Sequence, residues 1–431
     1  MGIASELEKT IAQHRFHGLQ EQFQGSGFVM PFYGGLSIAN LGATVAGLLG
    51  MELEGAEPPV PRNIWGDLVG GVRTVVLVLL DGVGYAQLLP LLQDGDRPFG
   101  RLASRGKVAP LTSVFPSTTL TAMTSLWTGR TPGDHGFLGS HLLLSEFGVL
   151  ANMLKLAPAA GGMPGELLQW GLAPDRFVSV PNVAQTLSAA GVRTAAHLYG
   201  PHVGSGLARI LLRGVDRMVG HVGFSDMWAN VQETVAQRTS QPLFVKVYWF
   251  GTDDVAHAYG PNGERSRAAL RDLGRSMQED FIDRLPGSAR EGTVLIVTAD
   301  HGQIATPEGS AVRLLDHPAL RRMLLIPPAG EKRASYLYAL PGHAEDVADY
   351  VGEHLADRFL LLETEAALSA GLFGSSEVSP LLRGRLGDFL LLARGDGSLV
   401  PAGEKAAYRG HHGSLTPEEM LVPLVMARLD G

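Results

Sequence analysis

RTVVLVLLDG, at residues 73 to 82, has the pattern of a buried β-strand that ends in a polar group. The six residues before Asp81 are all apolar, which is typical of a strand covered on both faces of a sheet. Asp81 and Gly82 follow at once, so the strand delivers a carboxylate beside a residue that permits a tight turn. The run VLIVTADHGQ, at residues 294 to 303, repeats this combination.

Further strand candidates alternate with helical stretches along the chain. In a sheet built this way, most strands are parallel and helices lie on its faces. We therefore predict an α/β fold, a three-layer sandwich with a mostly parallel central sheet flanked by helices. Ligands of such folds bind at the carboxyl ends of the strands. The other strands are expected at residues 107–115, 192–200, 242–250, 293–299 and 420–429, and helices at 86–93, 118–127 and 264–285.

The chain divides into three predicted parts. Residues 1–70 end in a Pro-rich stretch and are expected to form an N-terminal extension that packs on the core. Residues 71–330 and 405–431 carry the strand and helix alternation and are expected to form the catalytic core. Residues 331–404 are less regular and rich in Leu, Ala and Gly, and we interpret them as a smaller inserted cap subdomain.

Composition indicates a compact globular enzyme. Of 431 residues, 45% are apolar and 18% are charged, and the mean hydropathy is +0.10. The net charge of −8 and the lack of a long basic run argue against a nucleic-acid polymer as partner, whereas a metal-filled pocket would still bind a phosphorylated substrate. There are no cysteines, which excludes disulfides and thiolate ligands.

No signal peptide or membrane span is evident, so we expect a cytoplasmic protein without a membrane partner. The oligomeric state stays open.

Hydroxyl, carboxylate and imidazole groups gather at five places where predicted strands end or helices begin. Each group alone has a plainer explanation, as a turn residue, a helix cap or a solvated loop residue. Together they point to one site, because the carboxyl ends of parallel strands share one edge of the sheet. The residues are Asp81; Ser117, Thr118 and Thr119; Asp253, Asp254 and His257; Asp300 and His301; and His411 and His412.

This combination of donors favours divalent metals. Carboxylate oxygens with imidazole nitrogens suit Zn²⁺ or Mn²⁺ better than Mg²⁺. Two such ions about 4 Å apart would clamp the attacking and leaving oxygens of a displacement at phosphorus. A threonine hydroxyl beside a cation loses its proton more readily, and a helix N-terminus adds N–H groups aimed at phosphoryl oxygens. Asp300 and His301 would supply two ligands to one ion, and Gly302 would let the chain turn around it.

Five motifs resemble the alkaline phosphatase superfamily, and most closely its type I phosphodiesterase/nucleotide pyrophosphatase branch. They stand in the order of that family over residues 73–301 and the C-terminal segment. The resemblance implies a metal-dependent hydrolase that cleaves phosphodiester or pyrophosphate bonds of a small phosphorylated substrate, such as a nucleotide. The motifs are LLDGVGY, FPSTTLTAMTSLWTGRTPGDHGFLG, TDDVAHAYGP, TADHGQ and GHHGSLTPEEMLVPL.

The resemblance also implies roles for individual residues. Thr119 would be the catalytic nucleophile, which becomes transiently phosphorylated or nucleotidylated. Members of this kind commonly bind two zinc ions, and manganese is the alternative metal. Asp253 is preferred over its neighbour Asp254 because the family places the carboxylate four residues before the histidine. The implied ligands of one ion are Asp81, Thr119, Asp300 and His301, and those of the other are Asp253, His257 and His412.

One departure from the family pattern leaves the substrate open. Phosphodiesterase relatives usually follow HGI with an asparagine that contacts the phosphoryl group, and HGFLGS here offers Ser140 at that place. The C/S-x-P-x-R setting of sulfatases is absent, which disfavours a sulfatase. Two enzymatic alternatives at the same site are a phosphomonoesterase and a hydrolase of carbon–phosphorus bonds like phosphonoacetate hydrolase. A third alternative is a catalytically inactive binding protein on this scaffold, although all expected ligand positions are filled.

Overall fold

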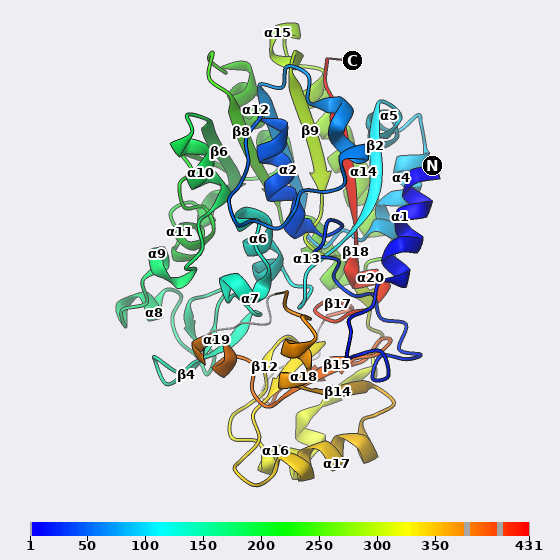
Figure 1. Ribbon diagram of the computed structural model, residues 1–431, viewed down its shortest axis with the longest axis vertical. Helices are drawn as coiled ribbons and strands as arrows, with labels where there is room; N and C mark the ends of the chain where they lie inside the picture. Colours follow the sequence, from blue (N-terminus) through cyan, green and yellow to red (C-terminus); the bar gives the residue numbers. More distant parts are fainter. Residues whose placement is uncertain (1, 375–379, 403–407, 431) are drawn as a thin grey trace.

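The computed structural model describes residues 2–374, 380–402 and 408–430, which form a larger and a smaller lobe (Figure 1). The larger lobe holds a seven-stranded sheet in the order β2-β18-β9-β1-β8-β6-β7. β1 pairs in parallel with β8 and β9, and β6 pairs in parallel with β7 and β8, whereas β18 runs antiparallel to both of its neighbours. The predicted mostly parallel central sheet is thus confirmed. The strands are β1 (Thr74–Leu80), β2 (Gly106–Thr112), β6 (Arg193–Tyr199), β7 (Arg217–His221), β8 (Leu243–Trp249), β9 (Thr293–Thr298) and β18 (Leu421–Arg428).

The neighbouring strands β9 and β1, in the middle of the sheet, are buried along their whole length, as their apolar sequences predict. In the register of β1 and β9, Leu79 pairs with Thr298. Since both strands then run on in the same direction, Asp81 and Asp300 leave the sheet at the same level. This register is what brings two carboxylates that are far apart in the sequence to one edge of the sheet.

Two groups of helices pack around this sheet (Figure 1). The first group consists of α2, α6, α10 and α11; its other helices contact α6, and α10 also contacts β6. The second group includes α4 and α5, which contact β18, and α12, which contacts β6, β7 and β8. The predicted helix at 264–285 changes its hydrogen-bond pattern and continues as the π-helix η4. The bounds are α2 (Leu41–Leu48), α4 (Tyr85–Gln93), α5 (Pro98–Ser104), α6 (Thr119–Thr128), α10 (Val183–Ala189), α11 (Gly206–Leu211), α12 (Phe224–Ala236), α14 (Glu264–Ser276) and η4 (Met277–Ile282).

The smaller lobe contains a second seven-stranded sheet, in the order β14-β15-β13-β12-β3-β4-β5. Its strands come from two segments of the chain, which meet where Gly330 pairs with His141. α16, α17 and α18 lie beside it in the lower part of Figure 1. The division at residues 331 and 405 remains a prediction, and residues 375–379 and 403–407 lie outside the described part. The bounds are β3 (His141–Leu144), β4 (Val149–Asn152), β5 (Ala157–Pro158), β12 (Ala329–Gly330), β13 (Ala334–Leu337), β14 (Phe359–Glu363), β15 (Phe389–Ala393), α16 (Pro318–Met323), α17 (Ala344–His354), α18 (Thr364–Ser369) and α19 (Pro380–Gly384).

Shorter elements complete the molecule. Near the N-terminus, α1 packs against β2 of the main sheet. Among the described residues, no helix combines the length and the apolar character needed to cross a membrane. The elements are α1 (Gly2–Gln13), η1 (Ile38–Asn40), α3 (Arg62–Trp65), η2 (Gly66–Leu68), α7 (Pro132–His135), α8 (Glu166–Gln169), α9 (Pro174–Phe177), η3 (Gly200–His202), α13 (Gly251–Tyr259), α15 (Gly287–Arg290), β10 (Ile304–Ala305), β11 (Ala311–Arg313), η5 (Leu314–Asp316), β16 (Ser398–Val400), β17 (Gly410–His411) and α20 (Pro417–Met420).

Candidate active site

Thr119 is the first residue of α6 and lies beside two of the strand ends. Its hydroxyl oxygen is 3.2 Å from Nε2 of His301 and 3.5 Å from Oδ1 of Asp81. The preceding residue, Thr118, has an extended backbone, so the chain enters the helix without a side-chain cap at that point. The hydroxyl of Thr119 therefore stands at the N-terminal end of a ten-residue helix, where N–H groups lack intrahelical acceptors.

The first cluster of possible metal ligands comprises Asp81, Asp300 and His301. One ligand atom from each lies within 4.8 Å of the others, and all three side chains are buried. Oδ1 of Asp300 accepts hydrogen bonds from the backbone N–H groups of Gly82 and His301. Its second oxygen, Oδ2, is buried and accepts no hydrogen bond within the described chain. A buried carboxylate oxygen without a donor fits a site that is completed by a cation.

Repulsion among the carboxylates also indicates that a cation completes this site. Burial, and then the carboxylates of Asp300 and Asp253, raise the pKa of Asp81 well above its ordinary value. Three acidic side chains at one buried edge of the sheet are unfavourable without positive charge. A divalent cation would supply that charge and keep the carboxylates ionised.

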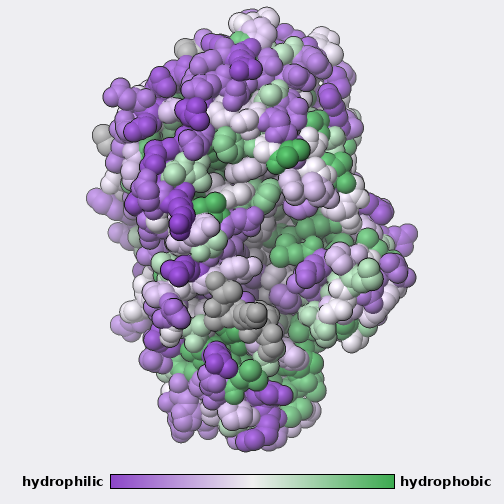
Figure 2. Space-filling model, turned by 180° about the vertical axis from the view of Figure 1, so that it is seen from behind, coloured by the Kyte–Doolittle hydropathy of each residue, from purple (hydrophilic) through white to green (hydrophobic). Residues whose placement is uncertain are grey.

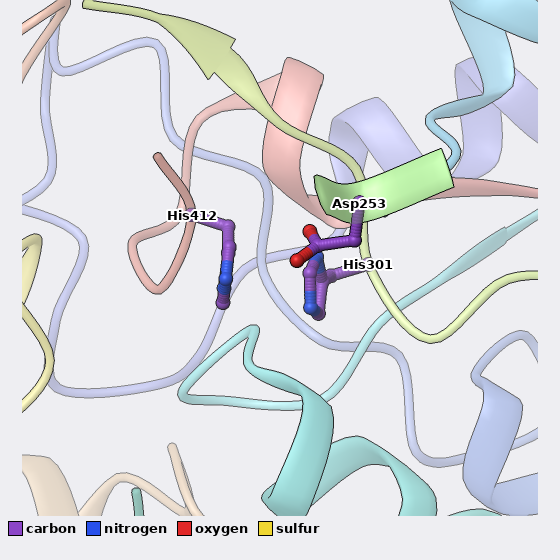
Figure 3. A group of neighbouring side chains, drawn as sticks. All are labelled: Asp253, His301 and His412. Carbon is purple, nitrogen blue, oxygen red and sulfur yellow. The ribbon is translucent and has the colours of Figure 1, made fainter. Parts of the chain in front are cut away.

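The second cluster comprises Asp253, His301 and His412, which face a common space (Figure 3). Asp253 comes from α13, which begins just after β8, and His257 lies one helical turn later with its Nε2 3.1 Å from Oδ2 of Asp253. Burial opposes ionisation, but the hydrogen bond from His257 and the charge of its ring hold the pKa of Asp253 below its ordinary value. His301 takes part in both clusters, so the two groups of ligands adjoin.

All three imidazoles of the site use Nδ1 for a backbone carbonyl. His257 bonds to the oxygen of Gly410 at 2.7 Å, His301 to that of Gly302 at 3.0 Å and His412 to that of Ser117 at 3.0 Å. Because a carbonyl oxygen only accepts, Nδ1 must carry the proton in each ring. In the neutral form of each ring, which is the form that ligates a metal, the lone pair is then on Nε2, which faces the clusters. This is the arrangement by which proteins orient histidines that ligate a metal. His257 reaches the neutral form when the proton on its Nε2, beside Asp253, is lost.

Other predicted residues have different surroundings. The backbone N–H and the hydroxyl of Ser140 both donate to the carboxylate of Glu331, at 2.7 Å and 3.0 Å. Nδ1 of His411 bonds to the hydroxyl of Thr306 at 2.7 Å. Within the described residues, Asp254 and His411 belong to neither ligand cluster, and neither does the predicted ligand His257, which contacts Asp253.

Two residues outside the predicted site also contact its carboxylates. The hydroxyl of Tyr248, on β8, donates to Oδ2 of Asp81, and the amide of Gln303 donates to Oδ1 of Asp253. A signal for Tyr248 exists in the sequence, since LFVKVYW places Lys246 and Tyr248 two residues apart, on one face of an otherwise mostly apolar strand. Gln303 directly follows the DHG motif and carries no comparable signal.

The comparisons with known proteins agree with this architecture. The family described as type I phosphodiesterase/nucleotide pyrophosphatase matches residues 75–415. No curated protein matches the chain in sequence. The structure is similar to murine ectonucleotide pyrophosphatase/phosphodiesterase 5, with a TM-score of 0.63 and 16% identity over 81% of this chain and 87% of that one. An inactive variant of the murine protein in complex with AMP gives a TM-score of 0.63 and 17% identity over the same shares.

A bacterial enzyme has a similar fold as well. Phosphonoacetate hydrolase from Sinorhizobium meliloti, in complex with phosphonoformate, gives a TM-score of 0.60 and 19% identity. The match covers 83% of this chain and 91% of that one. At this level of identity the structural similarities concern the fold.

Proposed function

The chain belongs to the type I phosphodiesterase/nucleotide pyrophosphatase family, and we propose that it hydrolyses phosphodiester or pyrophosphate bonds of small phosphorylated substrates through a covalent intermediate on Thr119. The observation that supports this most is the position of the Thr119 hydroxyl. It lies 3.2 Å from His301 Nε2, at a helix N-terminus and beside two clusters of metal-type ligands. The proposed nucleophile therefore lies next to the proposed metal ligands and to the backbone N–H groups that could bind phosphoryl oxygens.

The residues present fit two divalent cations, of which zinc suits the mixed oxygen and nitrogen donors best. When bound, the cations would supply Lewis-acid stabilisation of the charge that develops on the phosphoryl oxygens. The proposed ligands of one ion are Asp81, Thr119, Asp300 and His301, and those of the other are Asp253, His257 and His412.

The chemical steps concern Thr119 and a water molecule. The hydroxyl oxygen of Thr119 gives up its proton to solvent and attacks phosphorus, and the bond between phosphorus and the leaving oxygen breaks as that oxygen takes up a proton from solvent. This gives a phosphoryl or nucleotidyl ester of Thr119 and releases the leaving alcohol or phosphate. Water then attacks the same phosphorus, the bond to the Thr119 oxygen breaks, and the hydroxyl is restored with a proton.

Neighbouring groups hold the nucleophile and its surroundings in place. The hydroxyl of Ser117 donates to the carbonyl of Ser414 at 2.7 Å, and the carbonyl of Ser117 accepts from His412. The loop before Thr119 is therefore tied to the loop that carries His412. Ser140 donates to Glu331, so a direct contact of its hydroxyl with the phosphoryl group would require this bond to be exchanged.

Cleavage of a carbon–phosphorus bond is the second candidate function. It is favoured by the similarity in fold to phosphonoacetate hydrolase and by the absence of the family's usual asparagine near residue 140. The same Thr119 attack on phosphorus would then break the bond to carbon, and the departing carbon would keep the electron pair and take up a proton from water.

A comparison of three substrates tests the proposal. The zinc-loaded protein is assayed with bis-p-nitrophenyl phosphate, p-nitrophenyl phosphate and phosphonoacetate, with and without a chelator. We expect chelator-sensitive hydrolysis with the highest kcat/KM for the diester. Faster turnover of the monoester or of phosphonoacetate would contradict the diesterase proposal, and the absence of turnover on all three would favour a binding protein.

A further inference from the structure

A cavity of about 480 Å³ opens beside the nucleophile. Thr119 lies on its wall together with the rest of one side of α6, and other walls come from β6, β8, α11 and the segment 154–168. We call it the α6 cavity. Its volume falls in the range of about 300 to 1,000 Å³ that is usual for small-molecule sites.

The α6 wall of the cavity runs the length of the helix. Thr119, Met123 and Trp127 are spaced by four residues, which places them along one side of α6. Eight residues of α-helix correspond to about 12 Å. The cavity thus extends from the hydroxyl at the first turn of α6 to an aromatic ring at its last turn.

The sheet forms the opposite wall. Ala196 of β6 is paired with Lys246 of β8, and both line the cavity. Since side chains alternate along a strand, Leu198 and Tyr248 lie on the same face two residues further on. Tyr248 is the residue that donates to Asp81, so this wall leads from the carboxylate edge down to Lys246.

Lys246 is polar, but its terminal nitrogen already has partners. Nζ lies 3.0 Å from Oδ1 of Asn182 and 4.5 Å from the ring centroid of Trp127. Its side chain is 2% exposed. Most of the remaining wall is aliphatic, from residues such as Leu156, Leu168 and Leu211, and the further polar residues that line it are Lys155, His197, His202 and Ser205.

The cavity reaches the surface. Leu154, which lines it, is 55% exposed although it is a large apolar side chain. Figure 2 shows the surface hollowed at mid-height, with hydrophobic residues gathered there, between the larger lobe and the protruding part of the molecule. The exposed Leu154 places one wall of the cavity at the surface, from which a substrate could enter.

We propose that the α6 cavity receives an apolar organic group of the substrate's phosphate ester, and that the protein prefers esters of apolar alcohols to nucleotides. The inference rests on the proposed function, because it assumes that phosphorus binds at Thr119. An apolar group gains free energy from burial against the leucine-rich wall. A nucleoside brings ring nitrogens and sugar hydroxyls that would lose water without gaining enough partners there.

Binding of non-hydrolysable phosphonates tests the proposal without requiring turnover. Isothermal titration calorimetry on the zinc-loaded protein gives Kd for methylphosphonate, hexylphosphonate and AMP. Because each buried methylene strengthens binding by roughly fourfold, we expect hexylphosphonate to bind at least about tenfold more tightly than methylphosphonate. It should also bind more tightly than AMP. Equal Kd values for the two phosphonates, or tighter binding of AMP, would overturn the inference.

Two matched variants locate the effect. Leu154→Asp places a charge at the mouth of the cavity, and we expect it to weaken hexylphosphonate binding about fivefold or more while leaving methylphosphonate unchanged. Met163→Asp makes the same chemical change at a residue that is 76% exposed and does not line the cavity, and should alter neither Kd. An equal loss of hexylphosphonate affinity in both variants would contradict the assignment to this cavity.

The two proposals fail in different ways. If bis-p-nitrophenyl phosphate is hydrolysed but hexylphosphonate has no advantage over methylphosphonate, the cavity inference is wrong and the proposed function stands. If hexylphosphonate binds preferentially but no ester is hydrolysed, the cavity binds an apolar group and the hydrolase proposal is wrong.

Discussion

The imidazole rings of His301 and His412 stack with 3.7 Å between their centroids and 15° between their planes. Burial, and then the neighbouring His301, hold the pKa of His412 well below its ordinary value, so its ring is neutral at neutral pH. Each ring donates Nδ1–H to a backbone carbonyl and keeps its Nε2 lone pair. Two stacked rings thus offer nitrogen ligands from elements that are far apart in the sequence.

Removal of the Thr119 hydroxyl should abolish catalysis and leave the metals bound. We expect Thr119→Ala to lower kcat/KM for bis-p-nitrophenyl phosphate by at least about a thousandfold, because no covalent ester can form. Thr119→Ser keeps a hydroxyl at the same place and should retain part of the activity. The metal content of each variant is measured by elemental analysis, and an active alanine variant would exclude the covalent mechanism.

Asp300→Asn should weaken metal binding without lowering the stability of the metal-free protein. An asparagine keeps Oδ1 as acceptor for the N–H groups of Gly82 and His301, but it removes the negative charge beside Asp81. The metal-free variant should therefore melt at the same temperature as metal-free wild type or higher. Zinc should raise the melting temperature of wild type much more than that of the variant. A similar zinc effect in both would argue against Asp300 as a ligand.

Tyr248 positions Asp81, since its hydroxyl donates to the carboxylate oxygen Oδ2. We expect Tyr248→Phe to weaken zinc binding by about 10- to 100-fold, as is usual for partners of metal ligands. The control is Tyr259→Phe, a change of the same kind at a side chain that is half exposed. Competition with a chromogenic chelator measures both affinities, and unchanged affinity in Tyr248→Phe would contradict the positioning role.

Arg333 and Glu419 form a buried ion pair that supports the loop after His412. Nε of Arg333 lies 2.7 Å from Oε1 of Glu419, and the same oxygen accepts from the N–H of Ser414. Arg333→Met leaves the buried carboxylate unpaired, so we expect a loss of about 3 to 5 kcal/mol in the free energy of unfolding, measured by denaturant titration. Arg267→Met, which removes an exposed pair, should leave the unfolding curve almost unchanged.

Lys246 should make stability depend on pH. Burial lowers its pKa to about 7, whereas the unfolded chain keeps a lysine value of about 10.4. Between these values the unfolded state binds more protons, so the free energy of unfolding should rise with pH, by about 1.4 kcal/mol per unit from this residue. Urea unfolding at pH 8 and pH 9 should show this rise in wild type relative to Lys246→Met. An identical pH dependence of the two proteins would show that Lys246 is charged when folded.

The strands β1 and β9 could be predicted because each is a continuous apolar run that suits a strand buried on both faces of a sheet and is too short to cross a membrane. The sequence does not predict β7, since RMVGH is short and has two exposed, two partly buried and one buried residue, without a continuous apolar run. The gathering of polar groups at one edge of the sheet was expected from the strand ends, whereas the choice of Thr119 and Asp253 among their neighbours came from the family resemblance. The sharing of His301 between both clusters depends on side-chain geometry. The α6 cavity could not be predicted, because it depends on the register of Ala196 with Lys246 and on how α6 packs across from them.

The covalent intermediate is the central claim, and acid-quenched mass spectrometry tests it most directly. Zinc-loaded protein is mixed with excess bis-p-nitrophenyl phosphate, quenched in acid within the first turnover and digested. The account predicts a p-nitrophenyl phosphoryl adduct on the peptide that contains Thr119, absent in the Thr119→Ala variant and after chelation. Hydrolysis of the diester with no adduct on Thr119, or with the adduct on another residue, would contradict it.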